Sequence, residues 1–290
     1  MLKCKGSAKG GGGSKSRKGG GGSTTVKKER KLQTQKEHLV LLRSCLWDDA
    51  GKDKNPVAPF APFLQYKRNG LDLTLDFFSG GKLPRELRGW AFSLVKENIE
   101  QAYDASGYGW DDADKESELF DKAARLVIVR EAGGDKKPVG LVHFRFTLQG
   151  EFLQQMDGFP AILVYDLHLE SAVRGKGLGK HIMQLLELVA RKNKLSFLMT
   201  FVPDARACEK AKSFFLSTLK GFAVDNMYTE DGEGIVVLQK CLDRSILLAR
   251  QQKAAESKKL QDSILETLKQ IEIAKAKQAA GGKENSPASK

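Results

Sequence analysis

The chain has few cysteines and histidines for its length. Its 290 residues include four of each, and the cysteines Cys4, Cys45, Cys208 and Cys241 form no Cys-x-x-Cys pair. Structural zinc sites and disulfide frameworks need clustered or regularly spaced ligands. The pattern therefore argues against both, predicts no metal, and favours a reducing intracellular compartment.

A long apolar run is also missing. No segment approaches the roughly 20 apolar residues that a membrane-spanning helix needs, and the N-terminus lacks the apolar core of a signal peptide. The sequence therefore predicts no membrane contact.

Positive charge is concentrated at the two ends. The net charge is +12, of which residues 1–32 contribute +9 and residues 250–290 contribute +4, so the segment between them carries −1. Basic ends suit polyanions such as nucleic acid, ribosomes or chromatin, but they are equally typical of solvated, disordered tails. The oligomeric state is not predicted.

Composition divides the chain into five segments. Residues 1–25 form a disordered Gly/Ser/Lys tail, and residues 26–62 hold a polar helix and a Pro-rich linker. Residues 63–241 form the folded domain, residues 242–280 an amphipathic helix, and residues 281–290 a second disordered tail. The amphipathic helix suits a partner or a second helix, with too few clean heptads for a coiled coil.

The domain shows both helical and strand periodicity. Helices are expected at 84–101 and 180–192, with a Gly-rich aromatic loop over 102–110. Strands are expected at 124–131, 139–148, 161–170, 196–202, 222–225 and 234–239. Three adjacent strands followed by a β-α-β crossover predict an α/β (α+β) domain with a mixed sheet flanked by helices.

A glycine-rich turn, Arg174-Gly-Lys-Gly-Leu-Gly179, joins the third predicted strand to a helix. A helix N-terminus presents unpaired N–H groups and partial positive charge, so it binds phosphate oxygens, and glycines let the backbone approach closely. No Lys-Ser/Thr pair follows the last glycine, which disfavours a P-loop, and the turn follows the third or fourth strand rather than the first, unlike a dinucleotide fold.

The Arg-x-x-Gly-x-Gly pattern in this setting resembles the coenzyme A loop of the GNAT acetyltransferase superfamily. Within it, five runs in order resemble the N-alpha-acetyltransferase D (NatD) family, which acetylates the N-termini of histones H4 and H2-A: 66–71, 103–110, 143–146, 165–171 and 174–180. The resemblance implies a GNAT fold with a mostly antiparallel sheet, acetyl-CoA as cosubstrate, histone tails as partners, and a location in cytoplasm and nucleus.

The resemblance also implies the site residues. Coenzyme A would be bound by the backbone of Leu167, His168 and Leu169 and by the loop residues Arg174, Gly175, Lys176, Gly177, Leu178, Gly179 and Lys180. The peptide would contact Tyr103, Tyr108, Trp110, Tyr165 and Thr200.

A base is needed because a free α-amine, with a pKa of about 7.7 to 8.0, is mostly protonated at neutral pH. The resemblance implies Asp166 in that role, helped by Tyr165 or Tyr103, in a direct transfer without a covalent enzyme intermediate. His168 shares a strand face with Asp166 and is the alternative base.

Several positions depart from the family pattern. A tyrosine is replaced by Leu163, and a C-terminal tyrosine falls closest to Ile235, with Tyr228 as a stand-in. The acidic pair that holds a substrate arginine in the family reads Thr147 and Gln149 here, with Glu151 the nearest acid. Two alternatives therefore remain: a GNAT enzyme acting on a lysine side chain or another N-terminus, and a non-catalytic basic protein bound to chromatin or ribosomes.

Overall fold

The structure is a computed structural model that describes residues 21–151, 158–229 and 234–281. The chain divides into two compact units, Met1–Leu242 and Asp243–Lys290. Most of the first predicted tail and nearly all of the second lie outside the described residues. Helix α1 begins at Gly21, a few residues before the end of the tail predicted for residues 1–25.

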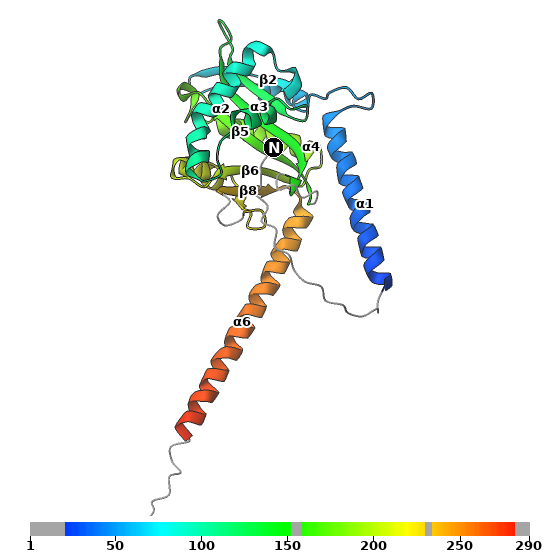
Figure 1. The fold of residues 1–290 in the computed structure, drawn as a ribbon, viewed down its shortest axis with the longest axis vertical. Coiled ribbons are helices and arrows are strands. Elements are labelled where there is room, and N and C mark those ends of the chain that lie inside the picture. The colour runs from blue at the N-terminus through cyan, green and yellow to red at the C-terminus, as the bar shows by residue number, and fades with distance from the viewer. Residues whose placement is uncertain (1–20, 152–157, 230–233, 282–290) are drawn as a thin grey trace, which may run out of the picture. The chain divides into compact units, whose positions relative to one another are not determined.

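One eight-stranded sheet forms the centre of the first unit, in the order β1-β2-β3-β4-β5-β6-β8-β7 (Figure 1). All neighbours are antiparallel except β5 and β6, which are parallel. The predicted mixed, mostly antiparallel sheet is confirmed. The strands are β1 (Gln65–Arg68), β2 (Leu71–Ser79), β3 (Arg125–Glu131), β4 (Pro138–Leu148), β5 (Pro160–Leu169), β6 (Phe197–Pro203), β7 (Phe222–Val224) and β8 (Ile235–Cys241).

Helices cover both faces of this sheet. One hydrophobic cluster joins the sheet to α1 and α4, and a second joins it to α2 and α3. The predicted stripe of α4 (Ile182, Leu185, Leu186 and Val189) is buried in the first cluster. The helices of this unit are α1 (Gly21–Leu46), α2 (Arg85–Ala105), α3 (Asp112–Leu119), α4 (Leu178–Lys192) and the short α5 (Glu209–Ser213).

The hairpin β1–β2 was not expected from the sequence. Its two-residue turn is Asn69-Gly70, and both residues have positive φ, +54° and +74°, as a type I′ turn requires. The glycine-rich loop therefore follows the fifth strand, and the expectation of a third or fourth strand is wrong.

Helix α2 is longer than expected, and α3 was missed. α2 continues to Ala105, so Tyr103 lies on the helix rather than in the following loop. α3 begins after Asp111, whose side chain accepts a hydrogen bond from the backbone N–H of Asp114. Such an N-cap satisfies one of the free N–H groups of the first turn.

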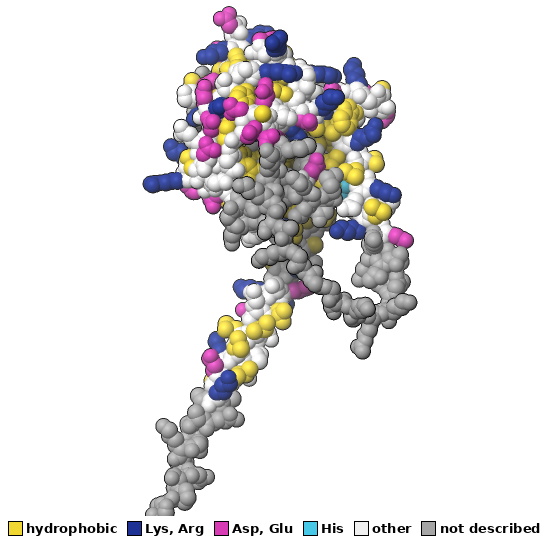
Figure 2. All heavy atoms as spheres, viewed as in Figure 1, with side chains coloured by type: hydrophobic (Ala, Val, Ile, Leu, Met, Phe, Trp, Pro, Cys, Tyr) yellow, Lys and Arg dark blue, Asp and Glu magenta, His cyan; other side chains and the backbone are white. Residues whose placement is uncertain are grey.

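The second unit consists of α6 (Arg244–Gly281), close to the predicted amphipathic helix. Asp243 caps its start by accepting hydrogen bonds from the backbone N–H groups of Ser245 and Ile246. Figure 2 shows both hydrophobic and charged side chains on the visible face of this helix. Over the described part of the chain, no helix has the length and apolar character needed to cross a membrane.

A matched pair of glycine substitutions tests the hairpin turn. An added Cβ meets nothing within 4 Å at either Gly70 or Gly89, so only backbone conformation distinguishes the sites. Gly70→Ala should cost about 1 kcal/mol of unfolding free energy because of its positive φ. Gly89→Ala, inside α2, should gain about 0.5–1 kcal/mol. Urea unfolding measures both, and equal effects at the two sites would contradict the turn assignment.

Candidate active site

β5 and β6 separate part-way along their length. Their parallel pairing ends at Val164↔Thr200, while β5 continues to Leu169. The Thr200 hydroxyl donates a 3.0 Å hydrogen bond to the Val164 carbonyl at this last pair. Beyond this pair, β5 stays hydrogen-bonded to β4 on one side, while the other edge of residues 165–169 is not paired with β6. The three predicted backbone contacts of coenzyme A fall on this open edge.

A β-bulge marks the start of the open edge. His143 pairs with Asp166 but Phe144 pairs with Val164, which leaves Tyr165 as the extra residue. The Tyr165 ring stacks on His143 at a centroid distance of 4.8 Å, meets Phe201 edge-on at 5.4 Å and carries the Arg145 guanidinium at 5.2 Å. Burial raises the pKa of Tyr165, so its hydroxyl is a proton donor at neutral pH.

The glycine-rich loop lies at the far end of this edge. Gly175 and Gly177 have φ values of +70° and +83°, and Gly177 precedes the first residue of α4. The Lys176 carbonyl accepts hydrogen bonds from the Tyr66 hydroxyl and from the Asn69 amide, the latter at 2.9 Å. A Cβ at Gly177 would lie 2.9 Å from the Tyr66 hydroxyl, so only glycine fits there. Hydrogen bonding from the hairpin thus fixes the loop at the helix N-terminus, where N–H groups bind anions.

The Arg174 side chain stabilises the conformation of the glycine-rich loop. Its Nε donates to the Leu169 carbonyl at 2.7 Å, and its guanidinium also donates to the Asn98 side chain on α2. The side chain predicted to contact coenzyme A therefore ties the loop to the end of β5 and to α2, and the anion-binding groups are the backbone N–H groups beyond it.

A cluster of charged side chains is buried between β4, β5 and α3. Lys115 Nζ lies 2.9 Å from Asp166 Oδ2 and 2.7 Å from Glu118 Oε1. His143 Nδ1 lies 3.0 Å from the same Asp166 Oδ2, and His168 Nε2 lies 3.4 Å from Asp166 Oδ1. The side chains of Asp166, His143 and Lys115 are only 2%, 0% and 8% exposed. The Asp166 carboxylate is thus enclosed by one ammonium and two imidazoles.

These contacts set the protonation states. Burial alone would raise the pKa of Asp166, but Lys115, His143 and His168 hold it well below its usual range. Burial would lower the pKa of Lys115, but Asp166 and Glu118 raise it. Burial lowers the pKa of His143 despite its bond to Asp166. At neutral pH the cluster therefore holds an ammonium, a carboxylate of low basicity and a neutral imidazole.

The same residues resemble a cation site. Ligand-type atoms of Glu118, His143 and Asp166 lie within 4.8 Å of one another. The Lys115 ammonium is hydrogen-bonded to two of the three, so it already supplies the positive charge that a metal would bring. The expectation of no metal stays a prediction.

The aromatic side chains predicted to contact the peptide gather beside this cluster. The Tyr103 ring lies 5.4 Å from that of Tyr108 and 6.0 Å from that of Trp110. Burial raises the pKa of Tyr103, and the charges of Lys115, Asp166 and Glu118 act on it. These rings form one wall next to the buried charges.

Other predicted positions lie elsewhere. Ile235 pairs with Pro203 at the start of β8. A Cβ added at Gly158 would lie 3.1 Å from the Tyr228 hydroxyl, which places that hydroxyl just before β5, roughly 25 Å along the strand from Asp166 at about 3.3 Å per residue. Tyr228 therefore does not replace the missing tyrosine at the charged cluster.

Thr147 and Gln149, which stand where the family has its acidic pair, each hydrogen-bond to another side chain. The Glu151 carboxylate accepts hydrogen bonds from the Thr147 hydroxyl at 2.6 Å and from the Leu148 N–H at 3.3 Å. Gln149 instead donates to the Gln239 side chain at 2.8 Å. Glu151 therefore places a carboxylate next to Thr147, close to a position where the family has an acid.

Sequence reasoning missed Lys115 and Glu118, and it left His143 without a role. The signal for α3 was Asp111, an N-cap residue before a short run of helix formers. Nothing in that run indicates that Lys115 reaches β5, because the pairing joins residues 51 positions apart.

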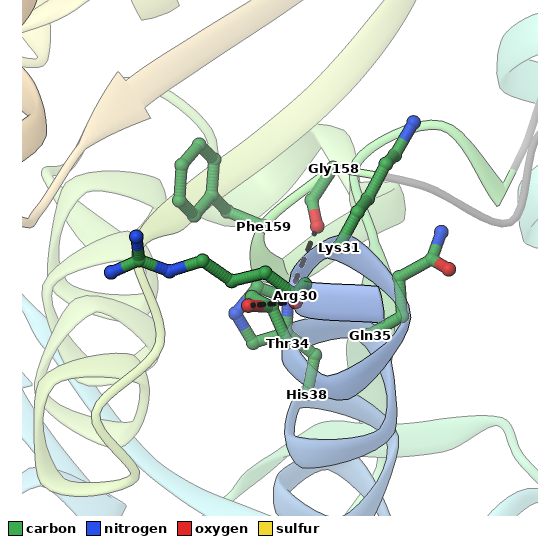
Figure 3. Close-up of a pocket in the computed structure, with 7 residues that line it drawn as sticks. All are labelled: Arg30, Lys31, Thr34, Gln35, His38, Gly158 and Phe159. Atoms are coloured by element: carbon green, nitrogen blue, oxygen red, sulfur yellow. Dashed lines mark hydrogen bonds between the residues drawn. The ribbon is translucent and has the colours of Figure 1, made fainter. Parts of the chain in front are cut away.

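A hollow lies between α1 and the start of β5 (Figure 3). His38 contacts the Gly158 carbonyl through Nδ1 at 3.3 Å, and its ring lies 6.0 Å from that of Phe159. The hollow is at the opposite end of β5 from Asp166 and is separate from the charged cluster. Its lining residues are Arg30, Lys31, Thr34, Gln35, His38, Gly158 and Phe159.

Comparison with known families agrees with this geometry. Residues 93–213 match the acetyltransferase (GNAT) family, and they run from α2 through the charged cluster and the glycine-rich loop to α5. The domain therefore has a GNAT fold, and this segment is similar to the GNAT acetyltransferases. The match includes Asp166, Lys115 and the loop, and leaves β1, β2, β7 and β8 outside it.

Similarity to individual solved structures is low. A GNAT-family acetyltransferase from Listeria monocytogenes is 14% identical, with 61% of this chain and 99% of that chain covered and a TM-score of 0.43. PaiA N-acetyltransferase from Thermoplasma acidophilum, in complex with coenzyme A, is 14% identical over 58% and 99%, with a TM-score of 0.40. Tetrahymena GCN5 is 12% identical over 58% and 96%, with a TM-score of 0.42.

The role of the buried Lys115 ammonium can be tested by its removal. Lys115→Met leaves the Asp166 and Glu118 carboxylates without a cation and should cost about 3–5 kcal/mol of unfolding free energy. Adding Asp166→Asn to that variant should recover part of the lost unfolding free energy, because one of the two unpaired buried carboxylates is removed.

Lys67→Met is the matched control, since Lys67 and Asp72 form an exposed pair at 3.0 Å. It should change the unfolding free energy by less than about 1 kcal/mol. Chemical denaturation of the wild type, these three variants and Asp166→Asn alone gives the comparison, and strictly additive effects of Lys115→Met and Asp166→Asn would argue against direct pairing of the two side chains.

Proposed function

We propose that this GNAT domain transfers the acetyl group of acetyl-CoA to the N-terminal α-amine of histones H4 and H2-A, as the NatD family does, in the cytoplasm and nucleus. The observation that carries the proposal is the open edge of β5, which has the glycine-rich loop at one end and the Asp166 cluster at the other. A cofactor lying along this edge would bring its phosphates to the loop and its thioester to the cluster.

Coenzyme A suits both parts of this path. The pyrophosphate would accept hydrogen bonds from N–H groups at the start of α4, next to Lys176 and Lys180. The pantetheine arm carries amides that would pair with the backbone of Leu167 and Leu169, as an added strand does at an unpaired sheet edge.

A positively charged amine suits the other side of the site. Within the cluster two carboxylates, Asp166 and Glu118, face one ammonium, Lys115, so the group as a whole is anionic when the histidines are neutral. The aromatic wall of Tyr103, Tyr108 and Trp110 provides a surface for a short peptide beside that charge.

The transfer is a direct attack in a ternary complex. The deprotonated amine attacks the thioester carbonyl, backbone N–H groups at the Tyr165 bulge stabilise the oxyanion, and the Tyr165 hydroxyl protonates the leaving thiolate. Cys208 is not needed as a nucleophile, and burial raises the pKa of its thiol. The low pKa of Asp166 fits poorly with its expected role as the base itself.

The basic tails extend the proposal to polyanions. Figure 2 shows basic and acidic side chains intermixed over the visible face of the domain, so contact with ribosomes or chromatin would fall to the tails. Most of the N-terminal tail lies outside the described residues, and its role stays a prediction.

Peptide acetylation tests the proposed function. The purified chain, with acetyl-CoA, should add one acetyl group to a Ser-Gly-Arg-Gly peptide with a free N-terminus, detected by mass spectrometry. The same peptide with a blocked N-terminus and one internal lysine is the control. Acetylation of the blocked peptide alone would favour the lysine alternative, and failure of coenzyme A to bind by calorimetry would favour the non-catalytic one.

A charge-neutral variant tests substrate choice. Glu151→Gln should raise the KM of the Ser-Gly-Arg-Gly peptide about tenfold, corresponding to loss of about 1.4 kcal/mol from a charge-assisted contact. The KM of a Ser-Gly-Ala-Gly peptide should not change, because it has no guanidinium. Glu131→Gln, at the exposed end of β3, serves as the control. Equal effects on both peptides would mean that Glu151 does not contact the arginine.

A further inference from the structure

The reaction needs a proton acceptor that the substrate amine can reach. Asp166 and His143 are buried, and both hydrogen-bond to partners inside the cluster. Lys115 is a cation, and the two tyrosines are proton donors at neutral pH. His168 and Glu118 are the members of the cluster that remain partly exposed, with 13% and 12% of their side chains accessible.

The two carboxylate oxygens of Asp166 have different partners. Oδ2 is held by the Lys115 ammonium and by His143 Nδ1. Oδ1 lies 3.4 Å from His168 Nε2. With Oδ2 already engaged by two donors, Oδ1 is the oxygen that orients the His168 ring. An imidazole whose one nitrogen faces a fixed carboxylate presents its other nitrogen as a proton acceptor.

His168 also lies in the right segment. It belongs to the open edge of β5, two residues beyond Asp166 on the same strand face, opposite Leu141 of β4. Glu118 lies on α3, where its carboxylate is bonded to Lys115 at 2.7 Å. The imidazole is therefore on the strand along which the thioester would approach, and the Glu118 carboxylate is not.

We propose that His168 is the catalytic base of this domain, with Asp166 as the residue that orients it and Lys115 and His143 as residues that position Asp166. The inference rests on the proposed acetyl transfer and deepens it. It assigns the proton to the His168 side chain, which the sequence offered only as the alternative to Asp166.

Proton transfers accompany the transfer of the acetyl group. His168 Nδ1 takes one proton from the substrate ammonium, and the freed lone pair forms the N–C bond to the thioester carbonyl carbon. The carbonyl π pair moves to oxygen and returns as the C–S bond breaks, with the bonding pair leaving on sulfur. Tyr165 gives its hydroxyl proton to the thiolate and takes one from the amine nitrogen. His168 then releases its proton to solvent, so each turnover yields an amide, a thiol and one proton.

Variants of the exposed members of the cluster test the assignment. His168→Gln should lower kcat by about 100- to 1,000-fold, the range for loss of a general base. The KM of acetyl-CoA should stay within about twofold because the backbone of residue 168 is retained. The shape of the pH–kcat profile should change as well, and added imidazole should restore part of the activity of His168→Ala.

Other titratable groups surround the Asp166–His168 pair and could shape the same profile: His143 on β4, Lys115 and Glu118 on α3, and Tyr103 on α2. Glu118→Gln is therefore measured in parallel over the same pH range. His38→Gln is the control, since His38 lies against Gly158 and Phe159 at the other end of β5. Calorimetric binding of coenzyme A shows that each variant is folded.

The outcomes separate this inference from the function on which it rests. Wild-type kcat and an unchanged pH profile in His168→Gln would overturn the inference alone, as would a larger loss in Glu118→Gln than in His168→Gln. Absence of wild-type turnover on both the free and the blocked peptide would overturn the proposed function, and the role of His168 with it.

Discussion

A buried ammonium is stable only among anions, and Lys115 has two of them within 2.9 Å. Leaving such a charge without partners costs several kcal/mol, so the pairing determines where α3 docks and which way its Lys115 face points. The same contact keeps Asp166 ionised at the bulge of β5. Because Lys115 and His143 occupy one oxygen of that carboxylate, the other is the one directed to His168. The Lys115–Asp166 ion pair therefore determines both where α3 docks and which oxygen of Asp166 faces His168.

The cofactor end of the site depends on neutral hydrogen bonds instead. The Lys176 carbonyl is turned toward Tyr66 and Asn69, and Arg174 holds the loop to the end of β5. With that carbonyl engaged by the hairpin, the N–H groups at the start of α4 are left for an anion. A net charge near zero in the central segment is compatible with phosphate binding for this reason, since backbone dipoles rather than a basic patch do the binding.

Much of the fold was predictable from the sequence. The strands from β3 onward and helix α4 follow from apolar periodicity, and the glycine-rich loop follows from its place between a strand and a helix. The β1–β2 hairpin was missed although Asn69-Gly70 is a strong turn signal, because β1 is polar apart from the buried Tyr66. Lys115 was out of reach for another reason: α3 is polar, and only the folded chain brings it to Asp166. The contact of Glu151 with Thr147 could not be predicted either. A comparison of the sequence with the family pattern, position by position, does not show that the Glu151 carboxylate folds back onto Thr147.

The contact between the hairpin and the loop joins residues 110 positions apart in the chain. Contacts of such long sequence separation form late in folding, because a long loop has to close before they contribute. During synthesis the hairpin leaves the ribosome well before the loop, so its partner residues are already available when the loop emerges. The linkage also works in reverse: a ligand that binds the loop stabilises strands that it does not touch. Amide exchange in β1 and β2 is therefore a remote reporter of cofactor occupancy.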